Sequence, residues 1–171
     1  MNIHISTVSS SLETVIVVGL FEGFQDISSA YIIKEKQVID YIKNLSSFNC
    51  TFGEFFTVGS IVERYVVVVG LGKKDEWNQN RALDIGGKVY TELNKLKLKQ
   101  ASVLIDGNVE SALNVAYGMF LRSFKFNKYQ TKKEELQEIE KIEVLVKDEN
   151  LDSAKKSFER LMNEGAGIFF T

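Results

Sequence analysis

The chain has 171 residues, a length that fits one domain able to bury a proper hydrophobic core. Hydrophobic residues make up 44% of the chain and charged residues 26%, as in ordinary soluble globular proteins. The formal net charge of -2 is too close to zero to imply a general affinity for nucleic acid or for anionic membranes.

The amino-terminal part of the chain predicts two strands and a helix. Residues 3–8 alternate apolar and polar side chains, as a strand with one buried face does. Residues 14–20 are a continuous, mostly β-branched run, which is typical of a strand covered on both faces. Residues 28–45 then change to a helical period with one apolar face.

The middle of the chain predicts a β-hairpin. Residues 52–58 and 61–69 read as strands, and the short link at Gly59-Ser60 favours antiparallel pairing. The second of these strands enters the turn from Gly70 to Lys74. The sheet should therefore contain at least one antiparallel pair.

The rest of the chain alternates helices and strands. Asp75 and Glu76 suit the positive end of a helix dipole, and Asn108 is a good N-cap. The pair Gly86-Gly87 inside a helix predicts close packing against a neighbouring element. The predicted elements are helices over 75–97, 109–126 and 150–164 and strands over 101–106 and 142–146, with a polar loop over 127–138.

This order of elements predicts the fold class. Strands that alternate with helices favour an α/β fold, a three-layer α/β/α sandwich around a mixed, mainly parallel sheet. The closing run from Gly165 to Thr171 is apolar, which indicates either docking onto the domain or a cut from a longer polypeptide.

The single cysteine and the lack of a targeting signal in the sequence predict a cytoplasmic protein. The single cysteine, Cys50, excludes an internal disulfide and a cysteine-rich zinc site, and we interpret it as a small semi-buried residue. The amino terminus has no signal-peptide pattern, and the apolar runs are too short to span a membrane.

The turn from Gly70 to Lys74 invites comparison with phosphate-binding loops. Backbone N–H groups at a helix start can bind anions. The spacing fits neither the Walker motif nor the dinucleotide fingerprint, which would need glycine at Asp75. We interpret the segment as a plain tight turn between a strand and a helix.

A basic stretch interleaved with aromatic residues follows later in the chain. Basic residues with stacking aromatics can bind single-stranded nucleic acid. The simpler interpretation is that the aromatic side chains pack under the loop while the lysines are solvated. The residues concerned are Arg122, Lys125, Lys128, Lys132 and Lys133, with Phe124, Phe126 and Tyr129 between them.

The ionisable residues give no credible active site or metal site. His4 is the only histidine, and its expected role is structural. A serine nucleophile elbow and the H-E-x-x-H zinc motif are both absent from the sequence. The aspartates that could have clustered are expected on different elements: Asp26, Asp40, Asp84, Asp106 and Asp148.

Three stretches, taken in order, carry a resemblance to a known family. Val66 to Lys74 resembles a strand that ends in a Gly-Leu-Gly-Lys turn, and Arg81 to Lys88 resembles the helix that follows it. Ala116 to Tyr129 is similar to an "a-x-G-x-x-L-x-x-Y/F-x-F-x-x-Y" pattern. Together they resemble the amino-terminal domain of the leucyl (cytosol) aminopeptidases, with 163–171 similar to the linker helix.

The resemblance implies a division of labour between domains. Residues 1–148 would form a macro-like amino-terminal domain, and 149–171 a helix leading toward a carboxy-terminal peptidase domain. The whole protein would be a homo-hexameric aminopeptidase with two divalent metals, zinc or manganese, that removes amino-terminal residues from peptides. The family's metal-binding and catalytic residues belong to the other domain, so none is expected here.

Two other functions stay open at this stage. A stand-alone macro-like module could bind ADP-ribose or a related nucleotide between two turns at the edge of the sheet, Gly70-Leu71-Gly72 and Asp106-Gly107-Asn108. A nucleic-acid-binding module could use the stretch from Arg122 to Lys133, although the acidic residues after it would offset its field.

Overall fold

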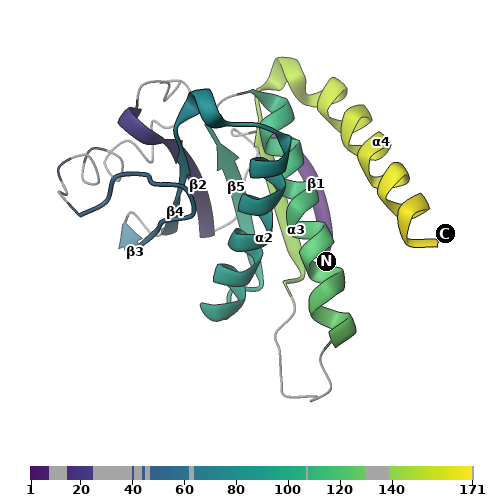
Figure 1. The fold of residues 1–171 in the computed structure, drawn as a ribbon, viewed down its shortest axis with the longest axis horizontal. Helices are drawn as coiled ribbons and strands as arrows, with labels where there is room; N and C mark the ends of the chain where they lie inside the picture. Colours follow the sequence, from purple (N-terminus) through teal and green to yellow (C-terminus); the bar gives the residue numbers. More distant parts are fainter. Residues whose placement is uncertain are drawn as a thin grey trace.

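Six strands form a single sheet in the order β1-β6-β5-β2-β4-β3 (Figure 1). The structure is a computed structural model that describes residues 1–7, 15–24, 40, 44, 47–61, 64–106, 108–129 and 139–170. The strands are β1 (Asn2–Thr7), β2 (Val15–Phe21), β3 (Phe55–Ile61), β4 (Arg64–Gly72), β5 (Gln100–Ile105) and β6 (Lys141–Val146).

The sheet is mixed and mainly parallel, as predicted. Four of its neighbouring pairs are parallel, and only β3 runs antiparallel to β4. The predicted hairpin is therefore confirmed, but its turn was misplaced. Gly59 and Ser60 lie within β3, because the pairing shifts register after Val58 and continues to Ile61 opposite Arg64. A register shift of this kind accommodates glycine inside a strand.

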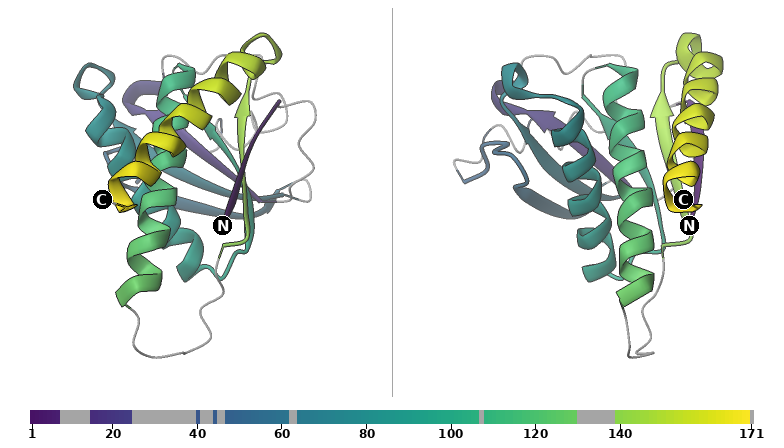
Figure 2. Two further views of the ribbon diagram at one scale, coloured as in Figure 1. Left: turned by 90° about the vertical axis from the view of Figure 1, so that its right-hand side faces the viewer. Right: turned by 45° about the vertical axis from the view of Figure 1, so that its right-hand side comes forward.

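Three long helices lie on one face of this sheet (Figures 1 and 2). Each packs residues into the same buried cluster with one face of the strands. The helices are α2 (Gln79–Lys95), α3 (Val109–Tyr129) and α4 (Leu151–Phe170), and short 3-10 turns are η2 (Glu22–Phe24), η3 (Lys74–Glu76) and η4 (Asp148–Asn150).

The central strands are buried on both faces. In β4, Val67 and Val69 belong to the cluster under the helices, whereas Val66 and Val68 belong to a second cluster on the opposite face. This alternation follows from the two-residue period of a strand. The α/β fold is thus confirmed. The helix predicted over 28–45 lies outside the described residues, apart from Asp40, which is helical, and Asn44, which lies in a turn.

The start of α2 differs from the prediction. Asn78 is the N-cap, since its side-chain oxygen accepts a hydrogen bond from the Arg81 N–H at 3.0 Å. Asp75 and Glu76 lie instead in η3, before the helix. An asparagine that fits the N-cap geometry fixes the first turn more strongly than acidic residues placed near the dipole.

Glycine brings α2 and α3 into backbone contact. A Cβ atom at Gly86 would overlap the Val115 carbonyl oxygen, and one at Gly118 would overlap the Leu83 carbonyl. The close packing predicted for the glycine pair is therefore confirmed at Gly86. A Cβ atom added at Gly87 would make only an ordinary contact, 4.0 Å from the Arg122 Cβ atom.

Two helices run past their predicted ends. α3 continues to Tyr129, so the first residues of the predicted loop are helical. α4 continues to Phe170 rather than ending at Glu164. The chain contains no proline, so no residue at these positions forces the helix to stop.

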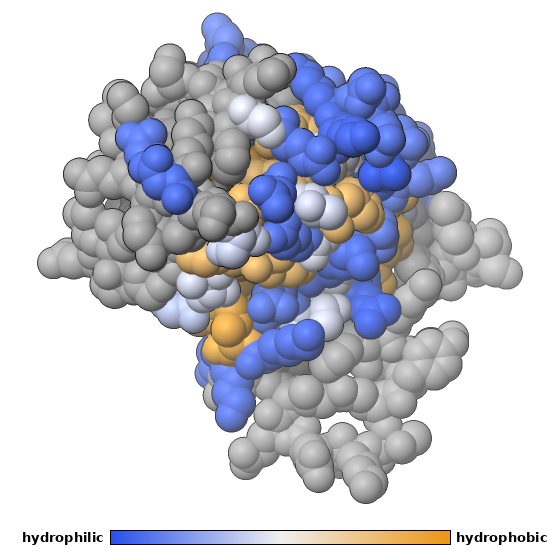
Figure 3. All heavy atoms as spheres, turned by 60° about the vertical axis from the view of Figure 1, so that its left-hand side comes forward, coloured by the Kyte–Doolittle hydropathy of each residue, from blue (hydrophilic) through white to orange (hydrophobic). Residues whose placement is uncertain are grey.

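Surface character varies over the molecule. On the face in Figure 3, hydrophilic side chains cover much of the described surface, with an apolar band among them. None of the described helices has the length and apolar character that a membrane-spanning segment requires.

Candidate functional site

The carboxyl edge of the parallel strands is the first place to look for a ligand site. Ligands of open α/β sheets bind outside the carboxyl ends of the strands. At this edge β2 ends at Phe21, β4 at Gly72 and β5 at Ile105. The two turns that sequence analysis singled out both belong to this edge.

A neighbouring loop fills the space beside the first turn. The Gly70 N–H donates to the Glu54 carbonyl oxygen at 2.7 Å, and the Gly72 N–H donates to that of Cys50 at 3.0 Å. In return, the Gly53 N–H donates to the Gly70 carbonyl oxygen at 2.9 Å. These two glycine N–H groups are therefore committed to protein carbonyls and do not form an anion cradle.

The loop that docks there is closed by one carboxylate. The Glu54 side chain accepts hydrogen bonds from the N–H groups of Thr51 at 3.1 Å and Asn49 at 3.4 Å. The Phe52 ring lies under the Arg81 guanidinium, whose carbon is 4.7 Å from the ring centroid. The loop is thus held both to β4 and to the first turn of α2.

Only glycine fits where the loop meets β4. A Cβ atom at Gly70 would overlap the carbonyl groups of Cys50 and Thr51. Gly72 has a φ of 78°, in the left-handed region that side chains disfavour. The prediction of a plain structural turn fits this geometry, with one change: Gly70 and Gly72 still belong to β4.

Cys50 lies at the centre of this loop, but it is not a reactive thiol. Its side chain is fully buried. Burial raises the pKa of the Cys50 thiol from 9.0 to about 12, with a further contribution from the charge of Glu54. A nucleophilic cysteine needs the opposite shift, toward the thiolate. The predicted structural role fits this environment, although the side chain is more deeply buried than expected.

The second turn is occupied by the start of α3. The Asn108 side-chain oxygen accepts hydrogen bonds from both the N–H and the hydroxyl of Ser111, each at 2.9 Å. The predicted N-cap is therefore confirmed. The Asp106 N–H donates to the Gly19 carbonyl oxygen at 2.9 Å. Gly107 lies outside the described residues.

Trp77 links β2 to α3 at this edge of the sheet, a role that the sequence did not predict. Its indole N–H donates to the Ser111 hydroxyl oxygen at 2.9 Å. The Phe21 ring meets the indole edge-to-face, with centroids 5.3 Å apart. The only tryptophan of the chain thus ties the end of β2 to the start of α3. The sequence feature that could have indicated this role is a single tryptophan immediately before the N-cap of a helix.

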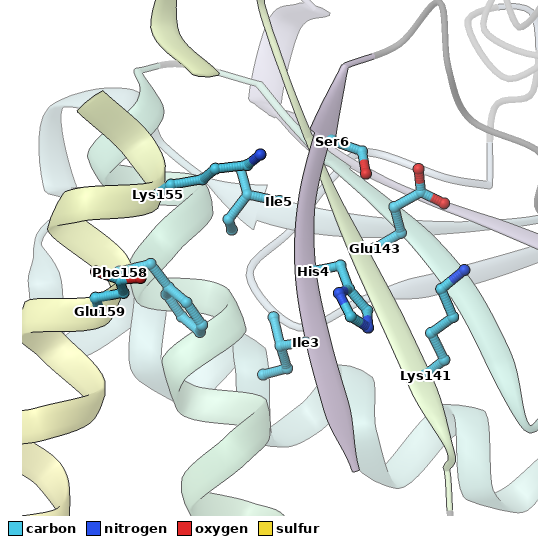
Figure 4. A pocket seen from close by; sticks show the side chains of 9 residues that line it. All are labelled: Ile3, His4, Ile5, Ser6, Lys141, Glu143, Lys155, Phe158 and Glu159. Carbon is cyan, nitrogen blue, oxygen red and sulfur yellow. The ribbon is translucent and has the colours of Figure 1, made fainter. Parts of the chain in front are cut away.

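His4 lies on the other side of the domain, beside a cavity of about 610 Å³ at the edge strand β1. In Figure 4, Ile3 and Ile5 point toward Phe158 and the rest of α4, whereas His4 points to the opposite face of the sheet. This cavity therefore extends around the edge of the sheet rather than forming one enclosed pocket.

The polar residues near His4 come from β6. His4 pairs in register with Glu143, which is buried, and Lys141 lies on the same face (Figure 4). Across the described ranges, no three His, Cys, Asp or Glu side chains are grouped so as to hold a metal ion. His4 stands exposed on β1, and its predicted structural role stays a prediction.

The aspartates predicted to be scattered lie on separate elements. Asp84 is exposed on α2, Asp106 follows β5, and Asp148 opens η4. Asp40 is exposed, and Asp26 lies outside the described residues. Within the part of the chain that the structure describes, they make no common site.

Only the first part of the basic stretch can be placed with its side chains. Arg122 and Phe124 are exposed on α3, and Phe124 is 46% exposed. The expectation that the aromatics pack under the loop is therefore wrong for Phe124, because α3 continues through this segment as a helix. Lys125, Phe126, Lys128 and Tyr129 lie on the same helix without described side chains, and Lys132 and Lys133 lie outside the described residues.

Comparisons with known proteins agree on one family. Residues 17–133 match the family model described as the cytosol aminopeptidase family, N-terminal domain. The chain is 56% identical over 170 residues to a probable cytosol aminopeptidase of Wolbachia pipientis wMel, covering 99% of this chain and 33% of that protein. It is 33% identical over 162 residues to one of Ehrlichia ruminantium strain Welgevonden, covering 91% and 32%.

A solved structure has the same fold. A mutant of tomato leucine aminopeptidase matches with a TM-score of 0.67 and 13% sequence identity. The match covers 93% of this chain and 35% of that one. The chain therefore spans about a third of the length of the proteins it resembles.

Proposed function

The chain belongs to the cytosol aminopeptidase family as its amino-terminal domain, and from this premise we propose that it is a non-catalytic part of a longer, cytoplasmic aminopeptidase. The longer protein would remove amino-terminal residues from peptides. This domain would serve assembly and would shield the active-site face. The proposal includes a macro-like fold for residues 1–148, with 149–171 leading toward the peptidase domain.

The proposal assigns the metals to the peptidase domain. Aminopeptidases of this family are metal-dependent, and we propose two divalent ions, zinc or manganese, and a homo-hexamer for the whole protein. The residues that the structure describes do not fit such a site. Among its described residues no metal-binding group occurs, and Cys50 is a buried thiol with a raised pKa. No step of hydrolysis is assigned to this chain.

One observation carries the proposal. The family model that matches is specifically that of the amino-terminal domain, and it covers residues 17–133. The geometry supports the same conclusion, because the carboxyl edge of the sheet is closed by the chain itself. Gly70 and Gly72 donate to protein carbonyls, and Asn108 caps α3. These contacts also disfavour the ADP-ribose alternative, which needs those groups for its ligand.

The test compares the 171-residue chain with the longer protein encoded by its gene. Both are purified and assayed on leucyl-p-nitroanilide with Mn²⁺ or Zn²⁺. We expect hydrolysis by the longer protein and none by the 171-residue chain. Hydrolysis by the chain alone would refute the proposal, and so would a gene that ends at Thr171.

A further inference from the structure

An aromatic stripe runs along the carboxyl-terminal half of α3. Tyr117, Phe120 and Phe124 follow one another at helical spacing, so their side chains share one face of the helix. The rings are in contact. The centroids of Tyr117 and Phe120 are 6.4 Å apart, and those of Phe120 and Phe124 are 4.8 Å apart and nearly perpendicular. We call these three residues the aromatic stripe.

The same face of α3 is covered by α4 only at its amino-terminal end. Leu113, one turn before Tyr117, is buried, and it borders a cavity of about 390 Å³ with Ala154 and Leu161 of α4. In Figure 1, α4 begins against α3 and diverges from it toward the carboxyl end. Exposure rises along the stripe accordingly.

Phe124 is the most exposed side chain of the aromatic stripe. Tyr117 and Phe120 are half-buried, and Phe124 is 46% exposed. It is the one large hydrophobic side chain in the exposed class among the described residues. Clustered aromatic side chains at the surface are typical of the centres of protein interfaces.

The carboxyl-terminal half of α4 approaches Tyr117, the first residue of the stripe. Burial raises the pKa of Tyr117, and the negative charge of Glu164 on α4 raises it further. α4 also packs beside β1. Phe158 and Met162 line a cavity of about 450 Å³ with Met1 and Ile3 of β1. α4 thus borders apolar side chains of both α3 and β1.

We propose that the aromatic stripe is the docking surface for the polypeptide that follows α4, namely the peptidase domain of the proposed function. The inference rests on that function. The relatives carry about two thirds of their length outside the matched part, and the matched domain is amino-terminal. In the proposed longer protein that length follows α4, whose Glu164 acts electrostatically on Tyr117 of the stripe. A domain connected at the end of α4 is then the occupant that covers Phe124.

The experiment measures how accessible position 124 is in the longer protein. Phe124→Cys and the control Arg122→Cys place thiols on opposite faces of α3, because the Arg122 Cβ atom faces Gly87 of α2. The native Cys50 is buried and contributes little background. The longer protein without either substitution measures the background from its other cysteines. We expect maleimide to label Phe124→Cys at least tenfold more slowly than Arg122→Cys.

A photo-crosslinker identifies what covers the stripe. The substitution Phe124→p-benzoylphenylalanine keeps an aromatic ring and needs no thiol. We expect its crosslinks, mapped by mass spectrometry, to reach residues after 171 of the same molecule. Crosslinks between isotope-labelled and unlabelled copies, crosslinks only within residues 1–171, or equal labelling of the two thiols would overturn the docking proposal.

These outcomes separate the two proposals. A longer protein that is inactive on leucyl-p-nitroanilide contradicts the proposed function itself. An active longer protein in which the thiol of Phe124→Cys labels as fast as that of Arg122→Cys contradicts only the docking surface.

Discussion

Two adjacent glycines in α2 should respond in opposite ways to the same substitution. Gly86 and Gly87 are neighbours inside the helix, so alanine improves helix propensity at each by about 1 kcal/mol. Their surroundings differ. At Gly86 the added methyl group would lie 2.7 Å from the Met119 backbone nitrogen and would overlap the Val115 carbonyl oxygen. At Gly87 it would lie 4.0 Å from the Arg122 Cβ atom.

The expected sizes follow from these distances. Ordinary contact needs roughly 3.5 Å or more, so Gly86→Ala forces α2 and α3 apart by about 1 Å. Overpacking of this kind costs about 1–3 kcal/mol, and the backbone of α3 cannot move aside as a flexible side chain can. We expect Gly86→Ala to lower the free energy of unfolding by up to about 2 kcal/mol, after the gain in propensity. Gly87→Ala should raise it by about 0.5–1 kcal/mol.

The assay is urea unfolding of the 171-residue chain, followed by Trp77 fluorescence and circular dichroism. The midpoints of the wild type and the two variants give the differences in free energy, provided that the slopes agree. Equal midpoints for the two variants, or a more stable Gly86→Ala, would refute the role of Gly86 as the contact point of the two helices.

Three further predictions concern the loop and the cap at the carboxyl edge of the sheet. Gly70→Ala should displace the loop that contains Cys50 and Thr51, lowering stability by about 1–3 kcal/mol and speeding proteolysis of that loop; unchanged cleavage would contradict the docking geometry. Asn108→Ala should lower the free energy of unfolding by about 1 kcal/mol and with it the melting temperature, whereas Asn108→Asp should keep the N-cap hydrogen bond. Equal melting temperatures of the two variants would argue against the capping role of Asn108. The buried Cys50 thiol should make the free energy of unfolding fall at alkaline pH. Because its folded pKa is raised to about 12, its contribution is complete below about pH 9.0 and is lost as pH rises toward 12, at up to about 1.4 kcal/mol per pH unit. The difference in unfolding free energy between wild type and Cys50→Ala should show this fall, and a flat difference from pH 9 to 11 would exclude it.

Much of the sheet could be predicted from periodicity. The run from Val66 to Val69 is buried on both faces of the sheet, as a continuous β-branched segment indicates. Positions that depend on contacts distant in sequence were less predictable. The hairpin turn moved beyond Gly59-Ser60 because a register shift lets β3 continue. The start of α2 moved to Asn78 because side-chain capping decided it.

At the candidate site, the sequence could predict only that a phosphate-binding loop is absent. Spacing alone argued against a phosphate loop from Gly70 to Lys74, and the structure adds the physical reason, since the glycine N–H groups already bind Glu54 and Cys50. Sequence could not show that Trp77 joins β2 to α3, because that contact spans 34 positions. Nor could it show Phe124 at the surface, which depends on how α4 diverges from α3.

Metal content tests the central claim most directly. Native mass spectrometry after incubation with Mn²⁺ or Zn²⁺, followed by removal of free metal, counts the ions bound to the 171-residue chain and to the longer protein. If the chain is a non-catalytic amino-terminal domain, it retains no metal while the longer protein retains two ions per subunit. A stoichiometric ion held by the 171-residue chain would contradict the account.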